Sequence, residues 1–277
     1  MTHEHKVQEF YDSALHCYER FMGDRWHHGD PDAEAAGLSS LEACQVLEQR
    51  MVALSGLKPG GRAIDFGSGI GGPTLYMARF ASASFVGMTN NERLNARARE
   101  RAASLGLSEQ VTFLTLDDTG YKDLPFADET IDVATFYESV CHLPDKATLF
   151  RELSRVLKPG GRLVGIDWLQ RNFGDYRTEA QIMKFMGPVN EFICIPAHGT
   201  VETYSAMMRE AGLEVCIARD LFAGVKCWGS TPDEQRQDWL EYMGPEAEMF
   251  RRGKQALDAA REAGVFTVGM FVARKPS

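Results

Sequence analysis

The sequence predicts an α/β fold in which a mostly parallel, doubly wound sheet carries helices on both faces. Short apolar segments of strand length alternate with segments of helix length through the middle of the chain. A glycine-rich turn joins the first of these strands to the helix that follows it. The 277 residues, of which 44% are hydrophobic and 25% charged, fit one large domain of this kind with insertions.

The first part of the chain, residues 1–56, is predicted to be a helical lid. Ser39 provides an N-cap signal, and apolar residues follow it at near-helical spacing as far as Leu57. Lys58 then begins a Lys-Pro-Gly-Gly turn. This turn is expected to end the helix, because proline and glycine both disfavour its continuation.

Seven strands are expected to form the sheet. They are short and apolar, and they cover residues 62–66, 84–88, 111–116, 131–136, 162–167, 213–220 and 265–273. Helices are expected between them at residues 73–80, 92–105, 145–157 and 232–263. Strand and helix alternate most regularly over residues 57–170, which are predicted to be the core. Residues 171–277 are predicted to complete the sheet and to carry inserted lid segments.

Composition narrows the classes of partner. The net charge of -9 and a pI near 5.3 disfavour binding to nucleic acid or to an anionic membrane surface. No apolar stretch approaches the ~20 residues that span a bilayer. The polar first residues lack the apolar segment of a signal peptide, which favours a cytoplasmic location. Six scattered cysteines without a C-x-x-C pair predict neither a metal site nor a disulfide framework.

The strongest local signal is the turn after the first strand, which runs Asp-Phe-Gly-Ser-Gly-Ile-Gly-Gly. Glycines let the backbone turn sharply and approach a ligand without a Cβ clash. The helix that follows also offers unpaired N–H groups at its start. We therefore expect this turn to bind a cofactor through Asp65, Gly67, Ser68, Gly69 and Gly71.

Three features favour S-adenosylmethionine over NAD as that cofactor. The glycine spacing is G-x-G-x-G, whereas the dinucleotide motif is G-x-G-x-x-G. Asp65 precedes the first glycine by two residues, where its carboxylate could receive the methionine ammonium directly or through water. Asp117 and Asp118 end the third strand, where an adenine amino group would need an acceptor.

With its flanking strands, this turn resembles the class I S-adenosylmethionine-dependent methyltransferases, which have a Rossmann-like fold. The resemblance covers about residues 55–170 and includes a Leu-Pro-Phe segment at Leu124 and a second Lys-Pro-Gly-Gly turn at Lys158. It implies a seven-stranded sheet and methyl transfer from S-adenosylmethionine. Most members carry an acidic residue after the second strand to hold the ribose. Here Thr89 and Asn90 stand in its place and are expected to bind the ribose.

A narrower resemblance concerns the segment after the fourth strand, Tyr-Glu-Ser-Val-Cys-His-Leu-Pro. It is similar to a glutamate-containing segment of the sterol and geranyl diphosphate C-methyltransferases, and it places an active-site carboxylate at Glu138. The whole chain resembles bacterial terpenoid C-methyltransferases of natural-product pathways. This resemblance implies a small, hydrophobic, prenylated acceptor and, by analogy, a homo-oligomer.

Alkene methylation sets clear chemical requirements. Attack of a prenyl double bond on a sulfonium methyl leaves a tertiary carbocation, which could rearrange or cyclise. Aromatic faces and a fixed carboxylate in a dry pocket stabilise such a cation, and a base must remove a proton. The candidates for catalysis are Glu138, His142, Tyr137 and Tyr204. The candidates for binding the acceptor are Tyr11, Tyr18, Trp26, Trp168 and His198.

Other functions remain open at this point. A small-molecule O- or N-methyltransferase would use His142 or Glu138 as a general base. A non-catalytic cofactor-binding or scaffold protein is disfavoured by the intact glycine turn together with Glu138. An NAD-dependent oxidoreductase is disfavoured by the glycine spacing and by the neutral end of the second strand. A diphosphate-bearing acceptor is less favoured, because few basic residues stand near the expected lid. These are Arg20, Arg25 and Lys184.

Overall fold

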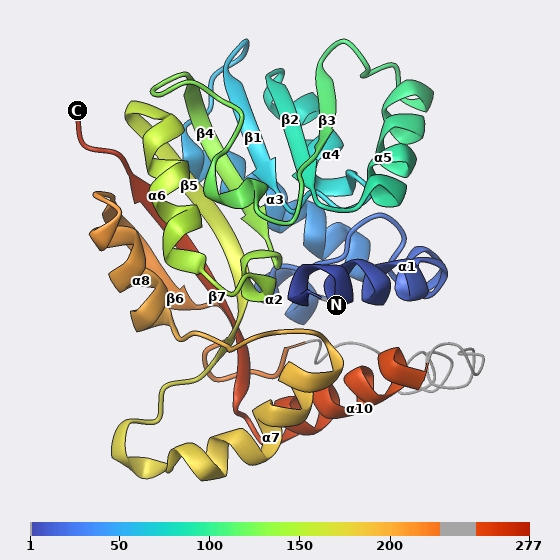
Figure 1. Cartoon of the computed structure of the whole chain (residues 1–277), viewed down its shortest axis with the longest axis vertical. Coiled ribbons are helices and arrows are strands. Elements are labelled where there is room, and N and C mark those ends of the chain that lie inside the picture. The colour runs from blue at the N-terminus through green and yellow to red at the C-terminus, as the bar shows by residue number, and fades with distance from the viewer. Residues whose placement is uncertain (1, 228–247) are drawn as a thin grey trace.

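The computed structural model describes residues 2–227 and 248–277. Its centre is a seven-stranded sheet in the order β3-β2-β1-β4-β5-β7-β6 (Figure 1). The strands are β1 (Arg62–Phe66), β2 (Ser84–Thr89), β3 (Val111–Thr115), β4 (Ile131–Tyr137), β5 (Leu157–Gln170), β6 (Glu214–Asp220) and β7 (Phe266–Arg274). Neighbours from β3 to β5 pair in parallel, whereas β7 is antiparallel to both β5 and β6. The predicted fold class and all seven strands are confirmed.

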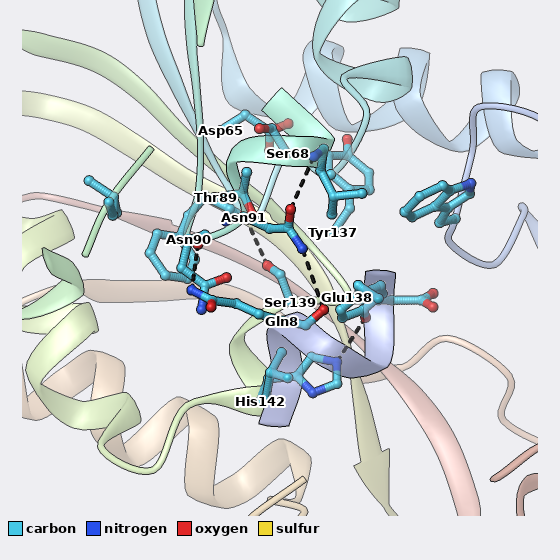
Figure 2. A pocket seen from close by; sticks show the side chains of 18 of the residues that line it. Gln8, Asp65, Ser68, Thr89, Asn90, Asn91, Tyr137, Glu138, Ser139 and His142 are labelled. Carbon is cyan, nitrogen blue, oxygen red and sulfur yellow. Dashed lines mark hydrogen bonds between the residues drawn. The ribbon is translucent and has the colours of Figure 1, made fainter. Parts of the chain in front are cut away.

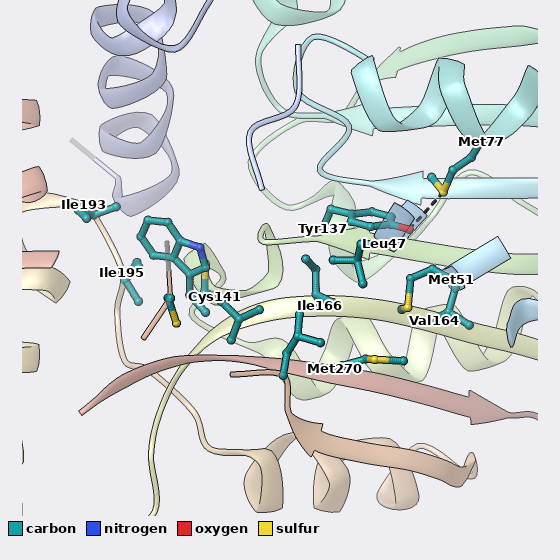
Figure 3. Packing of buried hydrophobic residues seen from close by; sticks show 14 of the residues in the cluster. Leu47, Met51, Met77, Tyr137, Cys141, Val164, Ile166, Ile193, Ile195 and Met270 are labelled. Atoms are coloured by element: carbon teal, nitrogen blue, oxygen red, sulfur yellow. Dashed lines mark hydrogen bonds between the residues drawn. The ribbon is translucent and has the colours of Figure 1, made fainter. Parts of the chain in front are cut away.

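Helices cover both faces of the sheet (Figure 1). One face carries α3 (Ser40–Ser55), α4 (Gly72–Ala81) and α5 (Glu92–Ser104), and the other carries α6 (Lys146–Val156) and α8 (Val201–Glu210). Successive strand residues point to opposite faces, so Ala63 and Val164 belong to the first core. Ile64 and Leu163 belong to the second. Figure 3 shows the first core, in which side chains of α3 and α4 pack on the sheet.

The N-terminal segment is helical, as predicted, but it is divided into α1 (His3–Met22), α2 (Pro31–Ala35) and α3. The Ser39 cap is confirmed, and Glu42 completes a capping box with it. Gly23, with a φ of 64°, ends α1. The loop between α1 and α2 is thereby free to turn inward, and its Trp26, His27 and His28 reach the interior of the protein.

The C-terminal additions lie beyond one end of the sheet. Helices α7 (Glu179–Phe192) and α10 (Glu248–Glu262) lie side by side there (Figure 1). The helix expected over residues 232–263 is therefore confirmed from Glu248 onward, and its first part lies outside the described residues. The described part of the chain also contains the short 3₁₀ turns η1 (Gly120–Lys122), η2 (Val140–His142) and η3 (Gly174–Tyr176).

The second Lys-Pro-Gly-Gly segment differs from expectation. It was predicted to be a turn before a strand starting at Arg162, but β5 already begins at Leu157. The register against β4 shifts here, because Ile131 pairs with Leu157 and Val133 pairs with Arg162. Extra residues on one strand form a bulge, and the φ of 77° at Gly160 makes this conformation possible.

The strand order places a ligand site at the boundary of β1 and β4. The chain proceeds outward from β1 to β3 and then returns to β4, so the direction of winding reverses between these two strands. Ligands of open α/β sheets bind at the carboxyl ends of the strands at such a point. The ends of β1, β2 and β4 all line one cavity here, and α1 forms its opposite wall.

Candidate active site

The glycine turn is confirmed as a strand-to-helix connection that lines the cavity. Gly67, Gly69 and Gly71 have φ values of 78°, 52° and 80°, which other residues rarely adopt. At Gly67 a Cβ would lie 2.1 Å from the Cβ of Ser139. At Gly69 it would lie no closer than 3.6 Å to the Trp26 ring. We expected side chains at both positions to fill cofactor space. The contact of Gly67 with Ser139 is a second reason for a glycine at that position, and the expectation about cofactor space stays a prediction.

Asp65 is a buried carboxylate at the end of β1 that lines the cavity (Figure 2). It accepts hydrogen bonds from the hydroxyls of Thr74 and Thr135, the latter at 2.7 Å. Burial raises the pKa of Asp65 to about 6, although both hydroxyl donors oppose this increase. Each carboxylate oxygen can accept a further hydrogen bond. An ammonium group therefore fits beside Asp65 and would stabilise its charge.

The opposite end of this cavity is lined by Thr89, Asn90, Asp117 and Asp118, all of which were predicted to bind the cofactor. Asp117 is exposed and accepts bonds from the backbone N–H and hydroxyl of Thr119, so it shapes its own turn. Asp118 instead faces α1. Its two oxygens accept from Thr2 at 3.2 Å and from Gln8 at 3.4 Å.

Helix α1 closes the cavity from the side opposite the sheet. Gln8 donates to the backbone oxygen of Asn90 at 2.7 Å, and it lies beside Asn90 in Figure 2. Gln8 was missed by sequence reasoning, because 82 residues separate it from its partner and no local pattern marks it. Ser139 was also missed, although it directly follows Glu138. Its hydroxyl donates to the Phe66 oxygen at 2.7 Å and ties the β4 turn to the glycine turn.

Glu138 occupies a strained position directly after β4. Its φ is 51°, in the left-handed region that costs a non-glycine residue roughly 1–3 kcal/mol. The backbone N–H of Glu138 donates to the Ile166 oxygen at 2.8 Å, which holds this conformation in place. This conformation ends β4 and directs the Glu138 carboxylate into the interior of the protein.

Three N–H groups converge on the Glu138 carboxylate. One oxygen accepts from the backbone N–H of His28 at 2.7 Å and from His28 Nδ1 at 2.8 Å. The other oxygen accepts from the indole N–H of Trp168. Burial alone would raise the pKa of Glu138. The interaction with His28, through its charge and its hydrogen bonds, and the charge of His27 hold this pKa below its usual value, although burial lowers the pKa of His28 itself. The N–H donors of His28 and the charge of His27 therefore carry most of this effect at neutral pH. Glu138 is therefore a buried carboxylate that stays ionised.

His27 places a positive charge beside this carboxylate. Its Nδ1 faces the His28 carbonyl at 2.8 Å, and its Nε2 faces the buried carboxylate of Glu48 at 3.0 Å. Both partners can only accept, so both ring nitrogens of His27 carry protons. Burial lowers the pKa of His27, but Glu48 and Glu138 together raise it above its usual value. This buried charge network was not foreseen, because it joins residues of three separate segments.

Three aromatic side chains form a cluster between α1 and the loop that follows it. The rings of Tyr11 and Trp26 are parallel with centroids 6.3 Å apart, and the Tyr18 and Trp26 centroids are 4.9 Å apart. The hydroxyl of Tyr11 lies 2.9 Å from Nε2 of His142. The structure therefore brings together three of the predicted acceptor-binding residues and one predicted catalytic residue.

A second cavity, of about 340 Å³, lies on the other side of this cluster. Its lining is largely aromatic and aliphatic, with Phe10, Phe21, Leu41 and Trp168 among its residues. Both cavities share part of their lining. The shared residues are Tyr11, Asp24, Trp26, His27 and Glu138. A group bound in one cavity would thus meet a group bound in the other at Glu138 and the aromatic cluster.

Three other residues that were predicted to belong to the site have side chains directed partly or wholly away from the two cavities. Tyr137 lines the first cavity with its ring, but its hydroxyl points into the core and donates to the Met77 sulfur at 3.3 Å (Figure 3). Tyr204 is fully buried and donates to Asp167 at 2.8 Å. His198 contacts Asn190. The lining of neither cavity includes Tyr204 or His198. Tyr204 packs in the core on the other face of the sheet, whereas His198 lies against Asn190 of α7 and the Phe266 ring.

Basic residues near the lid are more numerous than the sequence indicated. Arg25, Lys254 and Arg261 all line the second cavity. Each is paired with a carboxylate, Arg25 with Asp24 and the other two with Asp258. Helix α10 thus brings two basic residues to the second cavity that local sequence could not place there, and each of them is paired with a carboxylate.

Comparisons with known proteins agree with this geometry. A model of the methyltransferase domain matches residues 64–165. The 27-O-demethylrifamycin SV methyltransferase of Amycolatopsis mediterranei (strain S699) is 31% identical over 217 residues, which cover 78% of this chain and 76% of that protein. Cycloartenol-C-24-methyltransferase of Arabidopsis thaliana is 28% identical over 78% of this chain, and the match spans 62% of that longer protein.

A solved structure described as geranyl diphosphate methyltransferase in complex with GPP and sinefungin shares the fold. The TM-score is 0.77 at 16% identity, over 99% of this chain and all of that one. With the fold, the glycine turn and these relatives together, the chain belongs to the class I methyltransferases, whose cofactor is S-adenosylmethionine. Among residues 2–227 and 248–277, no helix is both long and apolar enough to cross a membrane.

Proposed function

We propose that this enzyme methylates an alkene carbon of a small terpenoid or prenylated acceptor and that the reaction passes through a carbocation. One observation carries the proposal: the ionised Glu138 lies at the meeting point of the two cavities, between Tyr11, Trp26 and Trp168. Bound S-adenosylmethionine supplies an electrophilic methyl group. The residues of the chain must hold that group, exclude water and stabilise the charge left on the acceptor.

The charges of the residues that line the first cavity support binding of the cofactor there. We assign its ammonium group to Asp65 and its ribose to Thr89 and Asn90, which all line this cavity. Asp118 and Gln8 offer an acceptor and a donor at the end of the cavity where an adenine would lie. Several carboxylates line this cavity, which suits a ligand with a net positive charge.

The second cavity fits an apolar acceptor with a reactive end at Glu138. A carboxylate about 4 Å from a cation contributes ~4 kcal/mol at an effective dielectric constant of ~20. An aromatic face contributes about 2 kcal/mol when the cation is desolvated. Glu138 is already charged and fixed by three N–H donors, so it need not reorganise as the cation forms. This arrangement supports carbocation chemistry.

An O-methyltransferase is the alternative, and a relative whose name refers to an O-demethylated substrate favours it. That reaction needs a base for a hydroxyl group. Burial lowers the pKa of His142 to about 4, which makes it a weak base for a hydroxyl. The lowered pKa of Glu138 limits that residue in the same way. The structure therefore favours the alkene, whose carbon needs no deprotonation before attack.

The deciding experiment is methyl transfer from labelled S-adenosylmethionine to a panel of acceptors. The panel contains geranyl diphosphate, a sterol and a geranylated indole, with a phenol and an amine as matched acceptors for the alternative. Label on a carbon atom of one of the alkenes would support the proposal. Label only on oxygen or nitrogen would overturn it. The expected homo-oligomer is a separate prediction, which sedimentation velocity would test.

A further inference from the structure

The interaction between Tyr11 and His142 defines which atom carries each proton. His142 Nδ1 lies 3.1 Å from the carbonyl oxygen of Cys194, which can only accept a hydrogen bond. Nδ1 therefore carries the ring proton. In the neutral ring Nε2 is then an acceptor, and the hydroxyl of Tyr11, 2.9 Å away, donates to it. The lone pairs of the Tyr11 oxygen remain available on its other sides.

Several groups keep this imidazole neutral. Burial lowers the pKa of His142 to about 4, and the nearby His3 and Lys146 lower it further, against the opposing effect of the Cys194 carbonyl. At pH 7 only about one ring in a thousand would be protonated. Nε2 is thus almost always ready to accept a proton. A carbocation is a far stronger acid than an imidazolium with this pKa, so such a weak base is sufficient.

Glu138 has a different role. Its carboxylate has about four lone-pair positions, and three of them already receive N–H donors. A proton on Glu138 would also remove the negative charge that balances His27. Glu138 is held in its charged form, whereas His142 is held in its neutral form. Such a difference between two ionisable groups of one site indicates that they have different roles in catalysis. Glu138 is suited to remain charged beside the cation, and Tyr11 with His142 is suited to take the proton.

We propose, on the basis of the proposed function, that Tyr11 and His142 act as a proton relay that ends the reaction. The C–H bond next to the cationic carbon breaks, and its electron pair becomes the new double bond. The proton passes to the oxygen of Tyr11 while the original hydroxyl proton of Tyr11 passes to His142 Nε2. The positive charge thereby moves from the acceptor to the imidazole. No oxidant, reductant or additional reactant is required.

The position of Tyr11 supports this role. It lines both cavities and its ring is stacked on Trp26, so Tyr11 is held at the junction of the two cavities. Tyr76, on α4, provides the comparison. Its hydroxyl accepts a hydrogen bond from Gln49 at 2.6 Å, and it belongs to the lining of neither cavity.

The test separates methyl transfer from the fate of the cation. The amount of S-adenosylhomocysteine formed measures methyl transfer. Mass spectrometry of the products then shows what happened to the cation: loss of the usual proton, loss of a different proton, or capture by water. In Tyr11→Phe we expect the ratio of the wild-type alkene to other products to fall about a hundredfold, the usual scale of general-base catalysis. His142→Gln should shift the ratio in the same direction. Tyr76→Phe, which removes a hydroxyl outside both cavities, should keep the wild-type ratio.

Each result is decisive. The relay is overturned if Tyr11→Phe and His142→Gln both give the wild-type product ratio, or if Tyr76→Phe changes it equally. Should Tyr11→Phe fail to bind the cofactor, the ratio from His142→Gln decides the matter. A wild-type enzyme that methylates no alkene carbon would refute the proposed function. A wild-type enzyme that does so, with unchanged ratios in both variants, would refute only the relay.

Discussion

Replacing Glu138 by glutamine tests the role of its charge most directly. The substitution keeps the size of the side chain but removes the negative charge between the two cavities. It also places an amide NH₂ group opposite at least one of the three N–H donors from His28 and Trp168, because glutamine has only one acceptor oxygen. The variant thus loses both the charge and part of the network that positions it.

The size of the effect follows from electrostatics. A carboxylate about 4 Å from a developing cation contributes ~4 kcal/mol at an effective dielectric constant of ~20. Loss of that stabilisation slows the chemical step by about a thousandfold. The cofactor is held mainly by other residues of the first cavity. We therefore expect its dissociation constant to rise less than about tenfold.

The assay is single-turnover methyl transfer with a saturating cofactor, combined with calorimetric measurement of cofactor binding. Glu48→Gln is the matched control, since it also removes a buried carboxylate but lies outside the lining of both cavities. It should lower thermal stability, because His27 loses its partner, and it should slow the chemical step much less. If Glu138→Gln keeps a rate within about threefold of the wild type, the proposed role of its charge is wrong.

Three further predictions concern the glycine turn, the cofactor and Trp168. In thermal melts, Gly67→Ala should lower the free energy of unfolding by more than Gly23→Ala does. Both glycines have a positive φ, but only at Gly67 would the added Cβ clash with a side chain, that of Ser139. Equal losses would contradict this. The cofactor should bind the ionised form of Asp65, whose pKa is about 6, so calorimetric affinity should fall about tenfold per pH unit below pH 6 and stay constant above it. A flat profile between pH 5 and 7 would refute the assignment. Trp168→Phe keeps an aromatic ring but removes one N–H donor to the Glu138 carboxylate. The rate of methyl transfer should therefore fall about tenfold while the affinity for the cofactor is unchanged. Weaker cofactor binding without a slower chemical step would argue for a structural role of Trp168.

Local features of the sequence were sufficient to predict the fold and the cofactor turn. Strand and helix periodicity, the Ser39 cap and the glycines from Gly67 to Gly71 act over a few residues, and neighbouring atoms determine their conformations. The segment directly after β4 was also recognised as the source of a carboxylate at Glu138, which the structure shows to be buried, and its role in the reaction stays a prediction. The fold and the turn could be predicted because their backbone geometry depends on residues of the same short segment.

The tertiary structure decided which side chains share the site. The partners His28 and Glu138 are 110 residues apart, and Tyr11 and His142 are 131 residues apart, so no local pattern pairs them. Tyr204 illustrates the opposite error, because a promising aromatic residue is buried on the far face of β5. The sequence by itself determined the fold class and the cofactor turn, since these depend on short-range geometry. Only the packing of α1, its following loop and α10 against the strand ends determined the second cavity and the charged residues that line it.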